Sequence, residues 1–173
     1  EDIRIFDRVS SSGLRYVDGT NISFYDLASQ LVHTKTTTGW NVEERLIPHP
    51  ALARLAPHSV STLRVLTLRT MNGHVHVGPI VLKVSLGKNA VDNFGAGNLA
   101  APVNMNTGEV GSAVRLYMVR HIKVYPTSGI AFNTVIVPDL EAVKLLVTVA
   151  ANTFNELDSL GWDVALTPDG PVI

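Results

Sequence analysis

The residue most able to carry chemistry is Asp163, a single carboxylate inside an apolar stretch near the end of the chain. That stretch, residues 161–166, reads Gly-Trp-Asp-Val-Ala-Leu, and a Thr-Pro-Asp-Gly turn follows it. An acid in a buried strand costs free energy unless a cation or a donor pairs with it. A hard cation such as Mg²⁺ binds carboxylate and phosphate oxygens together. Asp163 is therefore either a metal ligand or a structural acid that pairs with an arginine or caps the turn.

Two cations lie in strands that are otherwise apolar. By strand alternation Arg64 shares a face with Leu66 and Leu68. A guanidinium on such a face needs an anion, which is either a carboxylate in a structural ion pair or a phosphate. Lys83 ends the partner strand, where its ammonium is either solvated or close enough to bind a phosphate as a point charge.

Two polar segments are weaker candidates. Residues 91–99 form a glycine-rich loop that contains Asp92 and Asn93, and its amides could bind an anion. The loop opens no evident helix, so it matches neither a dinucleotide-binding nor a P-loop motif.

Residues 43–46 end a predicted strand and could present backbone groups to an adenine edge, although a charged strand end is the alternative. His74 and His76 share a strand face, but no third ligand is evident, so a metal site is not expected there.

The elements that must position these residues follow from hydrophobic periodicity and turn signals. Hairpins are predicted from residues 3–9 with 14–17, from 61–70 with 74–84 around an Asn-Gly turn, and over 162–173. Further strands are predicted at 40–47 and 115–124, and a long loop region at 89–111. A capping box at 23–26 starts one helix, a short helix covers 50–55, and a third runs from 139 toward 160.

The order of these elements predicts the fold class. Strands and helices mix without regular strand–helix–strand alternation, which favours an α+β fold. Both faces of the 61–84 hairpin are largely apolar, which predicts a sheet covered on both sides.

Composition excludes several classes of protein. The chain has 173 residues, a net charge of −1 and no cysteine. It therefore has no basic field for nucleic acid or an anionic membrane, and no disulfide or thiolate chemistry. A cytoplasmic location is expected. Because residue 1 is Glu and residue 173 falls inside an apolar run, we expect a partial domain that is truncated at both ends.

Several runs in order resemble the ATP-grasp superfamily, most closely the sugar-transfer-associated ATP-grasp proteins. Looser similarity extends to ribosomal-protein glutamate ligases and glutathione synthetases. The resembling runs, which span residues 40–173, are Val42-Glu43-Glu44-Arg45-Leu46 with His49-Pro50-Ala51-Leu52, Ser59-Val60-Ser61-Thr62-Leu63-Arg64, Val91-Asp92-Asn93-Phe94 with Ala96-Gly97, and Gly161-Trp162-Asp163-Val164-Ala165-Leu166.

The resemblance implies a fold like the ATP-binding domain of glutathione synthetase, with a mixed or antiparallel sheet packed against helices. Residues 1–39 would end the first subdomain, and residues 40–173 would form the adenine hinge and the second, metal-binding subdomain. ATP and Mg²⁺ are the implied cofactors. The implied site residues are Glu43, Glu44, Arg45 and Leu46 for adenine, Arg64 and Lys83 for catalysis, Asp92 and Asn93 for the substrate, and Asp163 for the metal.

The implied reaction is ATP-dependent ligation. A small-molecule carboxylate attacks the γ-phosphate to give an acylphosphate, and an amine or another nucleophile then displaces the phosphate. A kinase of the same superfamily and a non-catalytic ATP-grasp binding or scaffold module are the alternatives.

The chain also departs from the family pattern. Residues 125–129 read Tyr-Pro-Thr-Ser-Gly where relatives tend to have His-Pro-x-Thr-Gly. The family's Glu-x-Asn segment would follow residue 173, and its upstream lysine and glycine-rich loop would precede residue 1. We therefore expect this polypeptide by itself to be inactive.

Overall fold

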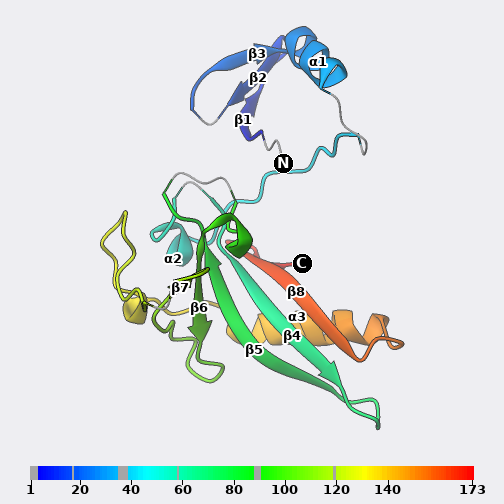
Figure 1. The fold of residues 1–173 in the computed structure, drawn as a ribbon. Helices are drawn as coiled ribbons and strands as arrows, with labels where there is room; N and C mark the ends of the chain where they lie inside the picture. The colour runs from blue at the N-terminus through cyan, green and yellow to red at the C-terminus, as the bar shows by residue number, and fades with distance from the viewer. Residues whose placement is uncertain (1–3, 17, 35–38, 58, 88–90, 119) are drawn as a thin grey trace. The chain divides into compact units, whose positions relative to one another are not determined.

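The computed structural model describes residues 4–16, 18–34, 39–57, 59–87, 91–118 and 120–173 (Figure 1). The chain divides into two compact units, Glu1–Arg45 and Leu46–Ile173, and each is described by itself. Within the described residues, no helix combines the length and apolar character needed to cross a bilayer. The assignment of residues 1–39 and 40–173 to ATP-grasp subdomains stays a prediction.

The first unit contains a small antiparallel sheet and one helix. Strands β1 (Phe6–Val9), β2 (Gly13–Tyr16) and β3 (Asn21–Ser23) pair in the order β1-β2-β3. Helix α1 (Phe24–His33) follows directly, and its N-cap Ser23 accepts a hydrogen bond from the Asp26 amide. The predicted first hairpin and capping box are thereby confirmed, except that residues 3 and 17 lie outside the described residues.

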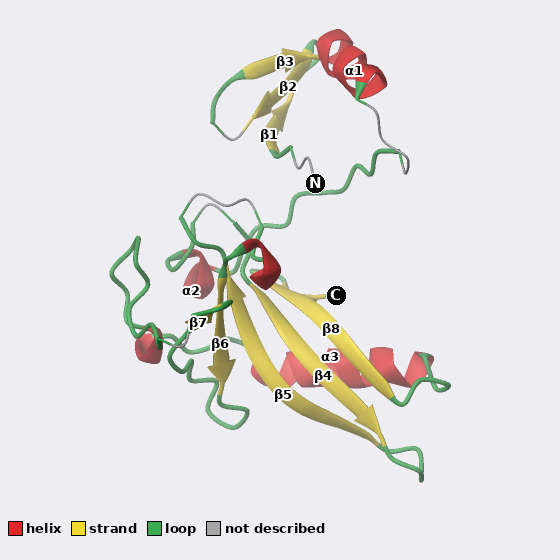
Figure 2. Cartoon of the chain, in the orientation of Figure 1, coloured by secondary structure: helices red, strands yellow, loops and turns green. Residues whose placement is uncertain are grey.

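The second unit is built on a six-stranded antiparallel sheet with the order β7-β6-β5-β4-β8-β9 (Figure 2). The β4–β5 and β8–β9 hairpins confirm two predicted strand pairs, and the α+β prediction is confirmed as well. The strands are β4 (Thr62–Arg69), β5 (Val75–Val84), β6 (Leu99–Val103), β7 (Val114–Arg115), β8 (Ser159–Thr167) and β9 (Gly170–Val172).

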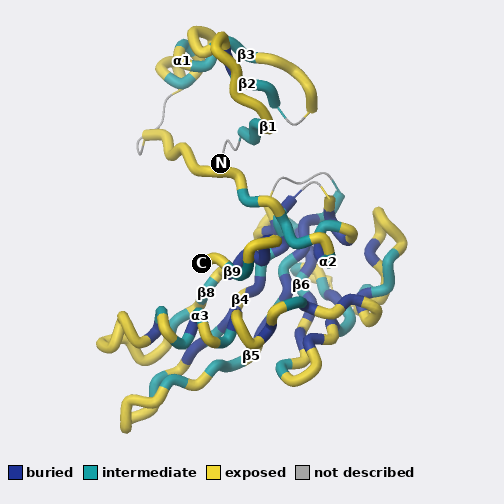
Figure 3. Tube along the Cα trace, turned by 180° about the vertical axis from the view of Figure 1, so that it is seen from behind, coloured by how far each residue is buried: buried dark blue, intermediate teal, exposed yellow. Residues whose placement is uncertain are grey.

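Helix α3 (Leu140–Thr153) packs on one face of this sheet (Figures 1 and 3). Its buried residues Val143 and Val147 belong to the same apolar core as alternate strand residues that are also fully buried. Burying this face supplies most of the unit's apolar core. The strand residues in question are Leu63 and Val65 of β4, Leu82 and Val84 of β5, and Val164 of β8. The short helices are α2 (Pro50–Ala53), η1 (Phe94–Ala96) and η2 (Phe132–Thr134).

The prediction that the sheet is covered on both faces is wrong within the second unit. Residues on the face away from α3 are half-buried or exposed over most of β4, including Arg64 and Leu68. Leucine and valine residues on this face led to the prediction that both faces are buried. Helix α3 covers only the opposite face. The face away from α3, here called the open face, is therefore where polar side chains can meet a ligand.

Several element predictions need correction. Residues 40–47 are irregular rather than a strand, because no described strand pairs with them. The predicted strand at 115–124 is reduced to β7 and an isolated bridge between Ala113 and Ile122. Residues 91–111 are not one loop but contain β6, while residues 89 and 90 lie outside the described residues. Helix α3 ends at Thr153, and the predicted helix at 50–55 is confirmed as the shorter α2.

Leu63→Ala should lower the free energy of unfolding by about 2–5 kcal/mol, because it opens a cavity in the apolar core of the second unit. Leu68→Ala is the matched control, since Leu68 lies on the same strand but is 45% exposed on the open face. That control should change stability by less than about 1 kcal/mol. Urea unfolding of both variants measures the difference, and equal losses would contradict a one-sided core.

Candidate functional site

The register of three adjacent strands gathers charged side chains on the open face. Thr62 of β4 lies opposite Lys83 of β5, and Arg64 of β4 lies opposite Asp163 of β8. Residues that pair directly across an antiparallel ladder point to the same face, as do residues two apart on one strand. Arg64, Lys83 and Asp163 therefore share one face, although they are far apart in sequence.

Asp163 is the centre of this group. Arg64 holds it through two parallel contacts, with Nε at 2.9 Å from Oδ1 and Nη2 donating to Oδ2 at 2.9 Å. The Lys83 ammonium lies 2.9 Å from the same Oδ1. Both oxygens of Asp163 are thus engaged by cations, in the bidentate geometry that arginine forms with carboxylates and phosphates.

Asp92 closes the group from the loop after β5. Its Oδ2 accepts hydrogen bonds from the Thr62 amide at 2.7 Å and the Thr62 hydroxyl at 2.6 Å. Its Oδ1 lies 3.7 Å from Lys83 Nζ, so the lysine sits between two carboxylates. Arg64, Lys83, Asp92 and Asp163 together are called the charged cluster below.

The charged cluster has an inner and an outer part. The side chains of Lys83 and Asp92 are only 13% and 11% exposed, whereas those of Arg64 and Asp163 are 51% and 47% exposed. An ion pair as exposed as Arg64–Asp163 contributes roughly 0–1 kcal/mol to stability. The outer pair is therefore accessible to a ligand and is not a major source of stability, while the inner pair is fixed.

Asn98, for which the sequence predicted no role, holds the loop of the charged cluster in place. The side chain of the fully buried Asn98 accepts a hydrogen bond from the Leu86 amide at 2.8 Å and donates to the carbonyls of Val91 and Asn93 at 2.9 and 3.0 Å. It thereby clamps the loop that carries Asp92. Its only sequence signal is a polar amide just before the apolar alternation of β6.

Gly161, which has no side chain, leaves space for the Arg64 guanidinium. A Cβ at this position would lie 3.1 Å from Arg64 Nη1, which is tighter than ordinary van der Waals contact. Gly161 lies two residues before Asp163 and hence on the same face of β8. The absence of a side chain there lets the guanidinium lie along β8 toward Asp163. The run Gly-Trp-Asp was part of the resemblance, but no role was predicted for its glycine.

Leu46 and Asn93, the other predicted site residues of the second unit, are not members of the charged cluster. Glu43, Glu44 and Arg45 are exposed residues of the first unit, and Leu46 is a half-buried residue of the second. Their predicted role in adenine binding stays a prediction. Asn93 follows Asp92, but its side chain accepts from the Gly95 amide at 3.2 Å and caps η1.

Tyr125, which stands where the resemblance leads us to expect a histidine, is a core residue. It is 1% exposed, and its hydroxyl donates to the Ser85 carbonyl at 2.8 Å. Ser85 lies two residues after Lys83, so Tyr125 supports the end of β5 and does not touch the charged cluster. The structure thus gives the tyrosine a packing role.

The residues present do not by themselves fit a magnesium ion. The described part of the chain contains no group of three or more His, Asp or Glu side chains that could hold a metal. Asp163 offers one carboxylate, and two cations occupy it. Asp92 faces Thr62 and Lys83. This donor set suits an anion better than a cation, and the assignment of Asp163 as a metal ligand stays a prediction.

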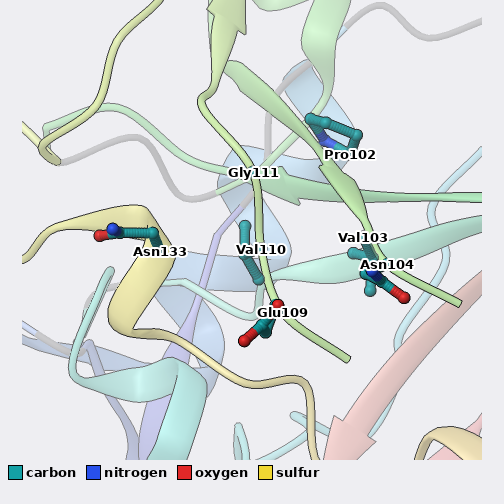
Figure 4. Close-up of a pocket in the computed structure, with 7 residues that line it drawn as sticks. All are labelled: Pro102, Val103, Asn104, Glu109, Val110, Gly111 and Asn133. Carbon is teal, nitrogen blue, oxygen red and sulfur yellow. The ribbon is translucent and has the colours of Figure 1, made fainter. Parts of the chain in front are cut away.

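A cavity of about 600 Å³ lies elsewhere in the second unit (Figure 4). No member of the charged cluster lines it. Its walls combine apolar and amide side chains with one carboxylate, that of Glu109, and include no cation. The lining residues are Pro102, Val103, Asn104, Glu109, Val110, Gly111 and Asn133. The cavity therefore gives no reason to move the candidate site away from the open face.

An α+β protein with an antiparallel sheet and a few helices is compatible with the ATP-grasp class. The family model described as "Sugar-transfer associated ATP-grasp" matches residues 20–173, and the chain belongs to this family. Comparison with curated proteins and with solved structures gives no match. ATP-grasp proteins in general bind ATP and Mg²⁺ and have ATP-dependent ligase-type activity. The expected fold like the ATP-binding domain of glutathione synthetase stays a prediction.

Thr62→Val should lower the free energy of unfolding by about 1–3 kcal/mol, because the buried Asp92 carboxylate loses a hydroxyl donor. Valine suits a strand, so a penalty from backbone propensity is not expected. Thr62→Ser keeps the hydroxyl and serves as the control. Chemical unfolding of the two variants decides the point, and a Val variant as stable as the wild type would show that the Thr62–Asp92 contact is dispensable.

Proposed function

We propose that this chain binds ATP as part of an ATP-dependent carboxylate–amine, or related, ligase, with the phosphates held over the open face by Arg64 and Lys83. The observation that carries the proposal is the convergence of these two cations from adjacent strands on one oxygen of Asp163. Family membership supplies the class of ligand. The geometry supports a site for an oxyanion, since guanidinium and ammonium groups bind phosphate as they bind carboxylate.

The proposed reaction begins with attack of a small-molecule carboxylate on the γ-phosphate. An acylphosphate and ADP form, and an amine or other nucleophile then displaces phosphate from the acyl carbon. Arg64, the more exposed cation, stabilises negative charge on the transferring group, and Lys83 does so from the floor of the site. Any Mg²⁺ needs ligands beyond those that the charged cluster offers.

The remaining residues have supporting parts in this proposal. Backbone groups of Glu43, Glu44, Arg45 and Leu46 would contact adenine, as the family resemblance implies. Asn93 would lie on the substrate side of the loop. Asp92 acts through Lys83, because it is 8% exposed and held by Thr62. Neither nucleic acid nor a membrane is a proposed partner, in keeping with the net charge of −1.

Arg64→Ala should weaken ATP binding at least about tenfold, because a charge-assisted contact to phosphate contributes about 1.5–3 kcal/mol. Isothermal titration calorimetry with ATP measures the dissociation constants. Arg120→Ala removes the same charge from an exposed position outside the charged cluster and should leave affinity nearly unchanged. Equal affinities for wild type and the Arg64 variant would remove Arg64 from the site, and absence of ATP binding by the wild type would overturn the proposal.

The type of reaction can be tested separately with hydroxylamine. A ligase that forms an acylphosphate should yield a hydroxamate when ATP, a carboxylate acceptor and hydroxylamine are supplied together, because hydroxylamine attacks the activated acyl group. Colorimetric detection of the hydroxamate gives the readout. ATP consumption without hydroxamate would favour a kinase over a ligase.

A further inference from the structure

The charged cluster is electrically balanced by its own side chains. Two cations, Arg64 and Lys83, face two carboxylates, Asp92 and Asp163. Asp163 holds both cations at 2.9 Å, so it occupies the position where an anionic ligand would make its best contacts. Any anion that binds both cations must first displace this carboxylate.

Asp163 is the carboxylate that can leave. Its side chain is 47% exposed, and a pair this exposed is weak because water screens it. Within the described residues its carboxylate pairs with Arg64 and Lys83, and no hydrogen bond from the backbone fixes it. An aspartate has only two side-chain torsions to change, so release needs no movement of β8.

Asp92 cannot leave in the same way. It is 8% exposed, and both the amide and the hydroxyl of Thr62 donate to it. When Asp163 is displaced, Lys83 therefore keeps a fixed partner 3.7 Å away and stays oriented toward the open face. Arg64 keeps its place beside Gly161, where no side chain competes for the space. The two cations thus remain convergent for the incoming ligand.

We propose that Asp163 is an internal anion that sets the ligand class of this site, admitting polyphosphates and rejecting singly charged anions. A single carboxylate can only exchange for Asp163 and gains nothing electrostatically. A polyphosphate places several negative oxygens against Arg64 and Lys83 at once, so its gain exceeds the cost of displacement. The inference rests on the proposed function and names the selectivity of the same site.

The test compares Asp163→Asn with Asp169→Asn, in metal-free buffer containing EDTA. Asp169 is an exposed acid in the β8–β9 turn of the same hairpin, so the control carries the same change in net charge. Titration calorimetry with inorganic tripolyphosphate and with acetate measures both ligand classes. We expect Asp163→Asn to bind tripolyphosphate at least tenfold tighter than the control and to bind acetate measurably, which the control does not.

The outcomes are distinguishable. If Asp163→Asn binds tripolyphosphate no tighter than Asp169→Asn while wild-type ATP binding depends on Arg64, only the internal-anion inference falls. If neither wild type nor variant binds tripolyphosphate or ATP, the proposed function falls with it. An NMR titration of the wild type tests the inference even if the variant does not fold. The Arg64 Nε–H resonance should shift with tripolyphosphate and not with equimolar acetate. No shift with tripolyphosphate would overturn the inference.

Discussion

The register of β4 against β5 and β8 is the constraint on which the site depends. It places Thr62 opposite Lys83 and Arg64 opposite Asp163, and it places the intervening Leu63 on the other, buried face of the sheet. A slip of one residue would turn every β4 side chain to the other face of the sheet. Arg64 would then enter the apolar core, and Leu63 would enter solvent. The same burial that stabilises the second unit therefore fixes the composition of the open face.

Burial also divides the cluster into a fixed and an adjustable part. A poorly exposed ion pair such as Lys83–Asp92 stabilises a protein only if its remaining hydrogen-bonding capacity is satisfied. Thr62 supplies that with two donors, and Asn98 anchors the loop from behind. The Arg64–Asp163 pair has no such support and is half exposed. The binding of an anion that we propose would thus rearrange only the outer pair.

The sequence predicted the members of the cluster better than it predicted their setting. Strand alternation identified Arg64 as a cation on an apolar face, and isolation in an apolar stretch identified Asp163. Both signals are local. Their contact joins β4 to β8, strands that no short turn connects, so it could only be suggested through the family resemblance. The sequence left two interpretations of Arg64 open, an ion pair with an acid and a contact to a bound anion. The half-exposed pair of Arg64 with Asp163 is compatible with both.

The wrong strand predictions concern segments whose pairing with other strands cannot be recognised from the local sequence. Residues 40–47 have strand-like residues but no described partner strand, so they stay irregular. Residues 99–103 were hidden in a glycine-rich stretch, although Leu99 and Ala101 alternate as β6 requires. Thr62 and Asn98 have no local signal for a role in the site. Their importance comes from what lies opposite or behind them, and periodicity along the chain does not encode that.

The double engagement of Asp163 reconciles a neutral cluster with a site for anions. Two cations on adjacent strands repel each other, and here Asp92 beside Lys83 and the space at Gly161 beside Arg64 help to keep them in place. The shared oxygen Oδ1 keeps Arg64 and Lys83 aimed at one point. Groups that are already oriented toward a common position need little reorganisation when a ligand oxygen replaces the carboxylate. In the site that we propose, the carboxylate that competes with the ligand therefore also orients both cations before the ligand binds.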